Sequence, residues 1–281
     1  MVALERAGIP VEKYYASEIE NKAIKVSNKN YPDIIQLGDI NNWRNWNIDW
    51  KNIDLVIGGS PCQGFSFCGK QLNFEDPRSK LFFVYVDILN HIKKSNPNVK
   101  FLLENVGSAS AKDKKVINET LGCMGVAFNS QLLSAQNRNR VYWTNFDFEV
   151  PTDRKEVYMQ DILEDSVSDK YYLTQKMYDC IMSPATKGWQ SGKMEINLKI
   201  ARPLTATMHK MHRADTDNYI STEYKPVDKT NVRRLTPLEC ERLQTLPDNY
   251  TEGISDTNRY KCIGNGWTVD VIAHILSYLK F

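Results

Sequence analysis

The first half of the chain alternates short apolar runs with amphipathic stretches. Three runs, at 14–17 (YYAS), 53–57 (IDLVI) and 99–103 (VKFLL), have the length and the flanking polar turns of buried strands. The stretch 77–93 begins with Pro77, a favoured first helical residue, and then carries apolar residues at helical spacing. Strands alternating with helices predict an α/β, Rossmann-like fold: a mixed, mostly parallel sheet with helices on both faces.

The pattern changes from about residue 151. The stretch 170–232 is polar and irregular, with only short apolar pieces, and predicts a small irregular, mostly-β domain. Helical signals return at 236–243 and at 268–279. We therefore expect one large domain made of 1–168 and 233–281, with a small domain at 169–232 inserted into it.

Composition excludes several classes of protein. With 42% hydrophobic and 25% charged residues, the 281-residue chain is typical of a globular domain, and no apolar run is long enough to span a membrane. The beginning of the sequence lacks the pattern of a secretory signal, which favours the cytoplasm. The six cysteines show no CxxC spacing and are expected to be free thiols, with no metal site. The net charge of +2 decides nothing about partners.

The candidate chemistry follows the predicted strands, because ligands and catalytic groups gather beyond the carboxyl ends of a parallel sheet. The run IDLVI leads into GGSPCQGFS, which contains Cys62, and VKFLL leads into Glu104. Farther on, QNRNR supplies Arg138 and Arg140 before another apolar run. A lone cysteine is usually a core residue and paired arginines are usually solvated. A thiol, a carboxyl group and two guanidinium groups at one sheet edge, however, fit covalent catalysis.

Four segments, GGSPCQGFS, LLENV, QNRNR and RRLTPLECERLQTLP, resemble in order the motifs of the DNA cytosine-5 methyltransferase family, bacterial and phage type. The resemblance covers nearly the whole chain. ASEIE and the terminal GNGWTVDVIAHIL are closest in style to the de novo methyltransferase branch of the family. The resemblance implies a cytoplasmic enzyme of a bacterial or phage-infected cell that acts on double-stranded DNA, with no membrane and no obligate protein partner.

The resemblance also assigns catalytic roles. The Cys62 thiolate would add to C6 of a flipped-out cytosine, which activates C5 toward the methyl group of S-adenosyl-L-methionine. Glu104 matches the acid that holds N3 and the exocyclic amine of the base. Arg140 matches the arginine that holds the base's O2, and Arg138 would support a phosphate or the base.

The same resemblance predicts a cofactor site and a DNA surface. Glu18 would hold the ribose hydroxyls and Asp39 the adenine amine, between Ile19 and Ile40. Gly266 stands where the family usually has serine, so Trp267 would pack there instead. Further expected cofactor contacts are Ser60, Pro61 and Asn265. Expected DNA contacts are Gln63 and Ser66 in the catalytic domain and Lys187, Trp189, Arg202, Lys210, His212 and Arg213 in 169–232, the expected target recognition domain.

One departure from the family is expected to matter. The family's first motif is a strand ending in Phe-x-Gly-x-Gly, whereas this sequence begins at MVALERAGIP, which resembles the helix after that motif. About a dozen added upstream residues are expected to rescue activity, given ordinary strand lengths. Two alternatives stay open: an RNA cytosine-5 methyltransferase of the same fold, or a catalytically impaired DNA-binding relative. The segment before RRLTP is long enough for a DNA-reading module, which favours DNA.

Overall fold

The computed structural model describes residues 1–59, 77–182, 195–210 and 213–280. Its central sheet has the strand order β3-β4-β6-β5, formed by β3 (Leu55–Gly59), β4 (Lys100–Val106), β6 (Asn139–Thr144) and β5 (Val126–Asn129). β3 and β4 run parallel, and β6 runs antiparallel to both of its neighbours. The predicted strands at 53–57 and 99–103 are therefore confirmed, each displaced toward its carboxyl end.

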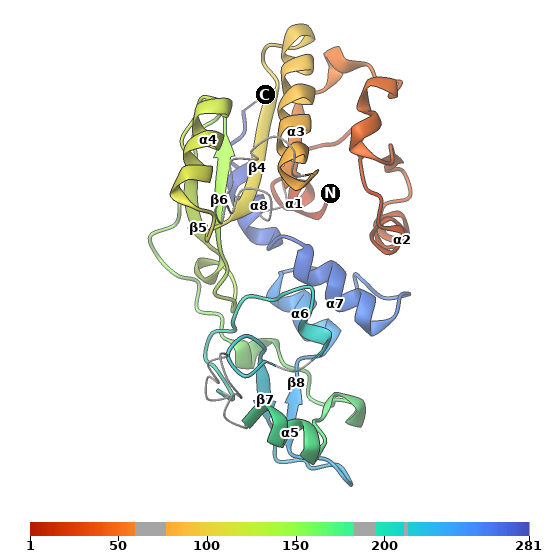
Figure 1. Ribbon diagram of the computed structural model, residues 1–281, viewed down its shortest axis with the longest axis vertical. Coiled ribbons are helices and arrows are strands. Elements are labelled where there is room, and N and C mark those ends of the chain that lie inside the picture. The colour runs from red at the N-terminus through yellow and green to blue at the C-terminus, as the bar shows by residue number, and fades with distance from the viewer. Residues whose placement is uncertain (60–76, 183–194, 211–212, 281) are drawn as a thin grey trace.

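Helices cover both faces of this sheet, as Figure 1 shows. On one face, α3 (Pro77–Ser95) and α4 (Ala111–Leu121) pack in a core with Phe101 and Leu103 of β4. On the other face, Leu102 packs with α1 (Val2–Arg6) and α8 (Val269–Leu276). Successive side chains of a strand point to opposite faces, so β4, apolar at all three positions, is buried on both sides. The predicted Rossmann-like fold is confirmed.

A second, shorter parallel pair lies beside the sheet. β1 (Tyr15–Ala16) and β2 (Ile35–Gln36) are joined through α2 (Asn21–Asn30). An apolar cavity of about 290 Å³ is lined by residues that include Tyr14 next to β1, Val26 of α2 and Ile57 of β3. Among the described strands, this pair shares no pairing with the main sheet.

The remainder of the chain extends away from the sheet, with α6 (Pro237–Leu243) and α7 (Asp256–Asn265) between the two parts (Figure 1). Beyond them lie α5 (Gln175–Met182) and the antiparallel pair β7 (Tyr219–Ser221) and β8 (Val232–Arg234), with a small core of their own. The helix α5 lies in a segment for which the sequence predicts strands and loops.

Local signals set the ends of the later helices. Thr236 caps α6, because its hydroxyl accepts from the N–H of Glu239 while the Glu239 carboxylate accepts from the N–H of Thr236. Connections in the described residues hold the 3-10 helices η1 (Ile40–Asn45), η2 (Trp50–Asn52), η4 (Ser130–Leu132), η5 (Met159–Ile162), η6 (Asp169–Tyr171) and η7 (Met208–Lys210). None of the described helices has the length and apolar character needed to cross a membrane.

Candidate active site

The site centres on Glu104, near the carboxyl end of β4. Strand register places it beside Gly59, the last residue of β3, and places Arg140 opposite Val106 at the same end of the sheet. The Glu104 side chain is 10% exposed, and its Oε1 lies 2.8 Å from Nε of Arg140. Its Oε2 accepts a 3.2 Å hydrogen bond from the indole Nε1 of Trp267. Both carboxylate oxygens are therefore held by donors from different elements.

Burial dominates the electrostatics of Glu104. Desolvation raises the pKa of the carboxyl group, and the charges of Arg140 and Arg138 and the bond from Trp267 only partly offset it. A carboxyl group with a raised pKa binds a proton more readily at neutral pH than an exposed one. It can then donate one hydrogen bond while its other oxygen accepts another.

Gly59 leaves room for the side chains of Glu104 and Trp267 to meet at the end of β3. A Cβ at Gly59 would lie 3.2 Å from Cζ2 of Trp267 and 3.3 Å from Oε2 of Glu104. A side chain there would crowd this contact, and the indole or the carboxyl group would have to move by a few tenths of an ångström. The expected catalytic residue Cys62, three positions along, lies outside the described residues, as do the expected contacts Ser60, Pro61, Gln63 and Ser66.

Arg138 makes contacts within the protein that the sequence does not predict. Its side chain is buried, and the guanidinium group donates to the carbonyl oxygens of Leu204 at 2.7 Å, Gly264 at 3.1 Å and Gly266 at 2.9 Å. Burial lowers the pKa of Arg138 to about 10, which still leaves it charged at neutral pH. Three backbone acceptors thus hold the guanidinium group within the protein, and the expected contact with a phosphate or the base stays a prediction.

Two buried glutamines, Gln136 and Gln244, extend the hydrogen bonds of Arg138 into a network. The sequence does not single them out. Gln136 accepts from the N–H of Leu204 and donates to the side chain of Gln244. Gln244 in turn donates to the carbonyl of Gly266 and accepts from the hydroxyl of Thr268. In the sequence they could be found only as uncharged polar residues within two motifs, Gln136 in QNRNR and Gln244 in ERLQTLP. The network fixes the backbone on both sides of Trp267.

The side chains expected to hold adenosine, Glu18 and Asp39, lie just beyond β1 and β2. The hydroxyl of Ser17 links these two strand ends by donating to the carbonyl of Gly38 at 2.7 Å. Oε1 of Glu18 accepts from the N–H groups of Ile19 and Glu20. Oδ1 of Asp39 accepts from the backbone and side chain of Asn41, and the backbone bond is the main cause of its lowered pKa.

This arrangement fits a nucleoside ligand. Ile19 is 72% exposed although it is apolar, so a ring stacked against it would remove that surface from water. Among the described residues no hydrogen bond reaches the second carboxylate oxygen of Glu18 or of Asp39, so both can accept from hydroxyl or amine donors. Ile40 is half-buried against the core that contains α3, and Asn265 is exposed at the end of α7.

The expected DNA contacts divide into two groups. Lys210 is exposed. Arg202 instead donates to the carbonyls of Ala214 and Asp217 and pairs with Glu195. Arg213 donates to two threonine hydroxyls and pairs with Asp217. The guanidinium groups of both arginines are engaged within 195–217, and their expected contacts with DNA stay predictions. Lys187, Trp189 and His212 lie outside the described residues.

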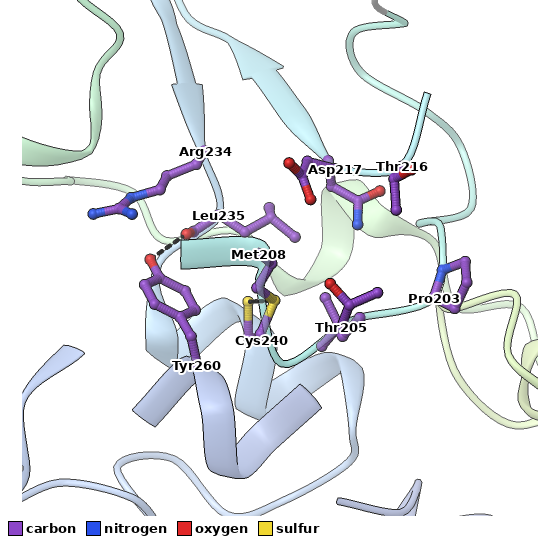
Figure 2. A pocket seen from close by; sticks show the side chains of 11 residues that line it. Pro203, Thr205, Met208, Thr216, Asp217, Arg234, Leu235, Cys240 and Tyr260 are labelled. Atoms are coloured by element: carbon purple, nitrogen blue, oxygen red, sulfur yellow. Dashed lines mark hydrogen bonds between the residues drawn. The ribbon is translucent and has the colours of Figure 1, made fainter. Parts of the chain in front are cut away.

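A small cavity marks the junction between the segment after Leu204 and helices α6 and α7 (Figure 2). There the hydroxyl of Tyr260 donates to the carbonyl of Leu235 at 2.7 Å, and Sγ of Cys240 lies 4.0 Å from Sδ of Met208. Burial raises the pKa of Cys240 well above its usual value, which disfavours the reactive thiolate. Cys240 is therefore a packing residue, and like Cys123, Cys180 and Cys262 it is a free thiol.

Comparison with known proteins agrees with this geometry. The sequence profile of the C-5 cytosine-specific DNA methylase family matches residues 1–280. The type II methyltransferase M1.ScrFI of Lactococcus lactis subsp. cremoris is 34% identical over 93% of this chain and 70% of its own length. M.HhaI of Haemophilus parahaemolyticus is 29% identical over 98% of this chain and 88% of its own.

Among solved structures, the S. pombe Dnmt2 methyltransferase superposes with a TM-score of 0.72 at 20% identity, covering 98% of this chain and 93% of its own. At that identity the likeness concerns the fold. The match of the family profile to almost every residue carries the assignment, and the predicted resemblance is confirmed: the chain belongs to the C-5 cytosine-specific DNA methylase family.

Proposed function

We propose that this chain transfers a methyl group from S-adenosyl-L-methionine to C5 of cytosine in double-stranded DNA. The observation that carries the proposal is Glu104, a buried carboxyl group at a strand end, held by Arg140 on one oxygen and by Trp267 on the other. The membership of the family and the relatives named as type II DNA methyltransferases support DNA as the substrate.

Glu104 and Arg140 suit the recognition and activation of a cytosine ring. A protonated Glu104 donates to N3 and accepts from the exocyclic amine, which offsets the negative charge that develops on the ring. Arg140 then shares its guanidinium group between Glu104 and the base's O2. Because these groups lie at a buried strand end, the base has to leave the DNA duplex to reach them.

Cys62 supplies the nucleophile in this proposal. Its thiolate adds to C6 and pushes electrons onto C5, which becomes nucleophilic. After C5 has taken up the methyl group, loss of the C5 proton and elimination of the thiolate restore the aromatic ring. Gly59, which stands three residues before Cys62 in the sequence, pairs with Glu104 in the strand register.

Glu18, Asp39 and Ile19 would hold S-adenosyl-L-methionine, with Asn265, Gly266 and Trp267 contributing from the closing motif. Bound there, it supplies an electrophilic methyl group. The exposed apolar surface of Ile19 and the available oxygens of the two acids are the features that suit its adenosine half. We assign residues 169–232 to target recognition, with exposed Lys210 among the DNA contacts.

The test is covalent trapping on duplex DNA that carries 5-fluorocytosine, because fluorine at C5 blocks the final elimination. The wild-type protein with S-adenosyl-L-methionine is expected to give an adduct that survives denaturation. Cys62→Ser is expected to give none while it unfolds at the same temperature as the wild type. Transfer of tritiated methyl groups to transfer RNA but not to duplex DNA would overturn the proposal, as would normal methylation by Cys62→Ser.

A further inference from the structure

Trp267 contacts the catalytic carboxyl group directly. Its indole Nε1 lies 3.2 Å from Oε2 of Glu104, and its ring borders Gly59, where an added Cβ would lie 3.3 Å from the same indole nitrogen. The contact joins the segment before α8 to the end of β4, two regions 163 residues apart in sequence. A donor at this position acts on the proton-holding group itself.

The backbone around Trp267 is held from both sides by buried polar groups. The carbonyl of Gly266 accepts from Arg138 at 2.9 Å and from Gln244 at 3.1 Å. The hydroxyl of Thr268 donates to the side chain of Gln244 at 2.8 Å. Such a network holds the backbone on both sides of Trp267 in place, since moving it would leave several buried polar groups unpaired.

We propose that Trp267 is a positioning residue for the proposed methyl transfer: its indole N–H fixes the orientation of Glu104 and sets how readily that group takes up a proton. The inference rests on the proposed function of Glu104. It is also separate from the expected packing of Trp267 against the cofactor, because the bond to Glu104 forms with protein groups alone.

The sign of the effect follows from the charges that face Glu104. Arg140 and Tyr142 face it from β6, Arg138 from the residue just before β6, and Trp267 from the segment before α8. A hydrogen bond donated to an ionised carboxylate stabilises the ionised form and lowers its pKa. Loss of the Trp267 donor therefore raises the pKa of Glu104, so protonation of the carboxyl group extends to higher pH.

The first experiment needs no substrate. Protein labelled with ¹⁵N-tryptophan gives indole N–H signals in nuclear magnetic resonance spectra, and the Trp267 signal is the one that Trp267→Phe removes. We expect this signal to titrate with pH in the wild type, and to lose that titration in Glu104→Gln. A Trp267 signal that is unchanged by Glu104→Gln would overturn the inference whether or not the protein methylates DNA.

The second experiment measures kcat against pH. Trp267→Phe keeps an aromatic ring but removes the donor. The alkaline limb of its profile is expected to move up by about one pH unit, because the free energy of a hydrogen bond to a charged group corresponds to a pKa change of about this size. Gly59→Ala, which wedges the contact, is expected to move it in the same direction by less. Trp50→Phe, at a residue that stacks on Trp46 and contacts His91, is the matched control and should leave the limb unmoved.

The profile also separates positioning from cofactor contact. If Trp267→Phe raised KM for S-adenosyl-L-methionine but left the alkaline limb in place, the inference would be wrong, and Trp267 would act only on the cofactor. Failure to trap DNA would remove the proposed function, which the substrate-free titration does not require. The two failures are therefore distinguishable.

Discussion

The carboxyl end of β4 and the carboxyl ends of β1 and β2 carry acidic residues that are held in opposite ways. Glu104 is buried, and its partners Arg140 and Trp267 come from distant parts of the chain. Glu18 and Asp39 are only half-buried, and each is held through hydrogen bonds to the one or two residues that follow it. The first acid depends on the tertiary fold, whereas the other two depend on local turns.

This difference in burial and partners matches the role proposed for each acid. A group that exchanges protons with a reacting ring gains from burial, because burial moves its pKa toward the working pH. A group that binds hydroxyl and amine donors of a ligand gains from staying ionised and accessible, so that the ligand completes the site. In the proposed function, the main sheet would thus supply a preorganised catalytic end, and the β1–β2 pair would supply an open binding end.

The largest expected effect is on catalysis. Glu104→Gln should lower kcat by about a thousandfold, within the range for loss of a positioned acid, while the affinity for S-adenosyl-L-methionine stays within about twofold of wild type. Single-turnover methylation and calorimetry would measure the two quantities. A large loss of cofactor affinity in Glu104→Gln would show that the carboxyl end of β4 and the carboxyl ends of β1 and β2 do not have separate roles.

The positions of β3 and β4 along the chain follow from the sequence, but the cavity lined by Ile57 and Tyr14 does not. Apolar runs flanked by polar turns locate β3 and β4, and the motif order predicts which strand ends meet. Periodicity cannot show how strands are ordered in a sheet, because pairing is decided by packing between distant segments. The cavity between Ile57 and Tyr14 therefore appears only in three dimensions.

The site was predictable where a side chain's role depends on its strand position. Glu104 and Arg140 meet as the motifs predict. The internal contacts of Arg138, Arg202 and Arg213 could not be predicted, since sequence alone cannot distinguish a guanidinium group in solvent from one that satisfies carbonyls within the protein. A buried arginine with several backbone acceptors is a stable arrangement, and it requires the segments around Leu204 and Gly266 to be folded together.

The next effect tests how strongly the catalytic end depends on distant contacts. Arg138→Met should lower the free energy of unfolding by about 3 kcal/mol, because it leaves the buried carbonyls of Leu204, Gly264 and Gly266 without this donor. Urea unfolding monitored by circular dichroism measures the change. The matched control is Arg44→Met at an exposed ion pair with Asp87, expected to stay within about 0.5 kcal/mol. Equal stability of the two variants would show that the carbonyls find other donors.

A smaller effect is expected at the binding end. Glu18→Gln should weaken S-adenosyl-L-methionine binding by about tenfold, or roughly 1.4 kcal/mol, and leave the unfolding midpoint unchanged, because its bonds in the protein are local. Glu20→Gln provides the control, since that carboxylate is paired with Lys261 on the surface. If both variants bound alike, Glu18 would have no specific role at this site.

The smallest effect concerns Ile19, whose side chain is 72% exposed and contributes little to folding. Ile19→Ala removes apolar surface that a bound adenine would cover, so calorimetry should show affinity weaker by about threefold to tenfold. Ile35→Ala removes the same atoms from another exposed position, 43% accessible on β2, and should leave the affinity unchanged. If Ile19→Ala lowered stability instead of affinity, its exposed surface would be covered within the protein in solution, and the β1–β2 end would not be open.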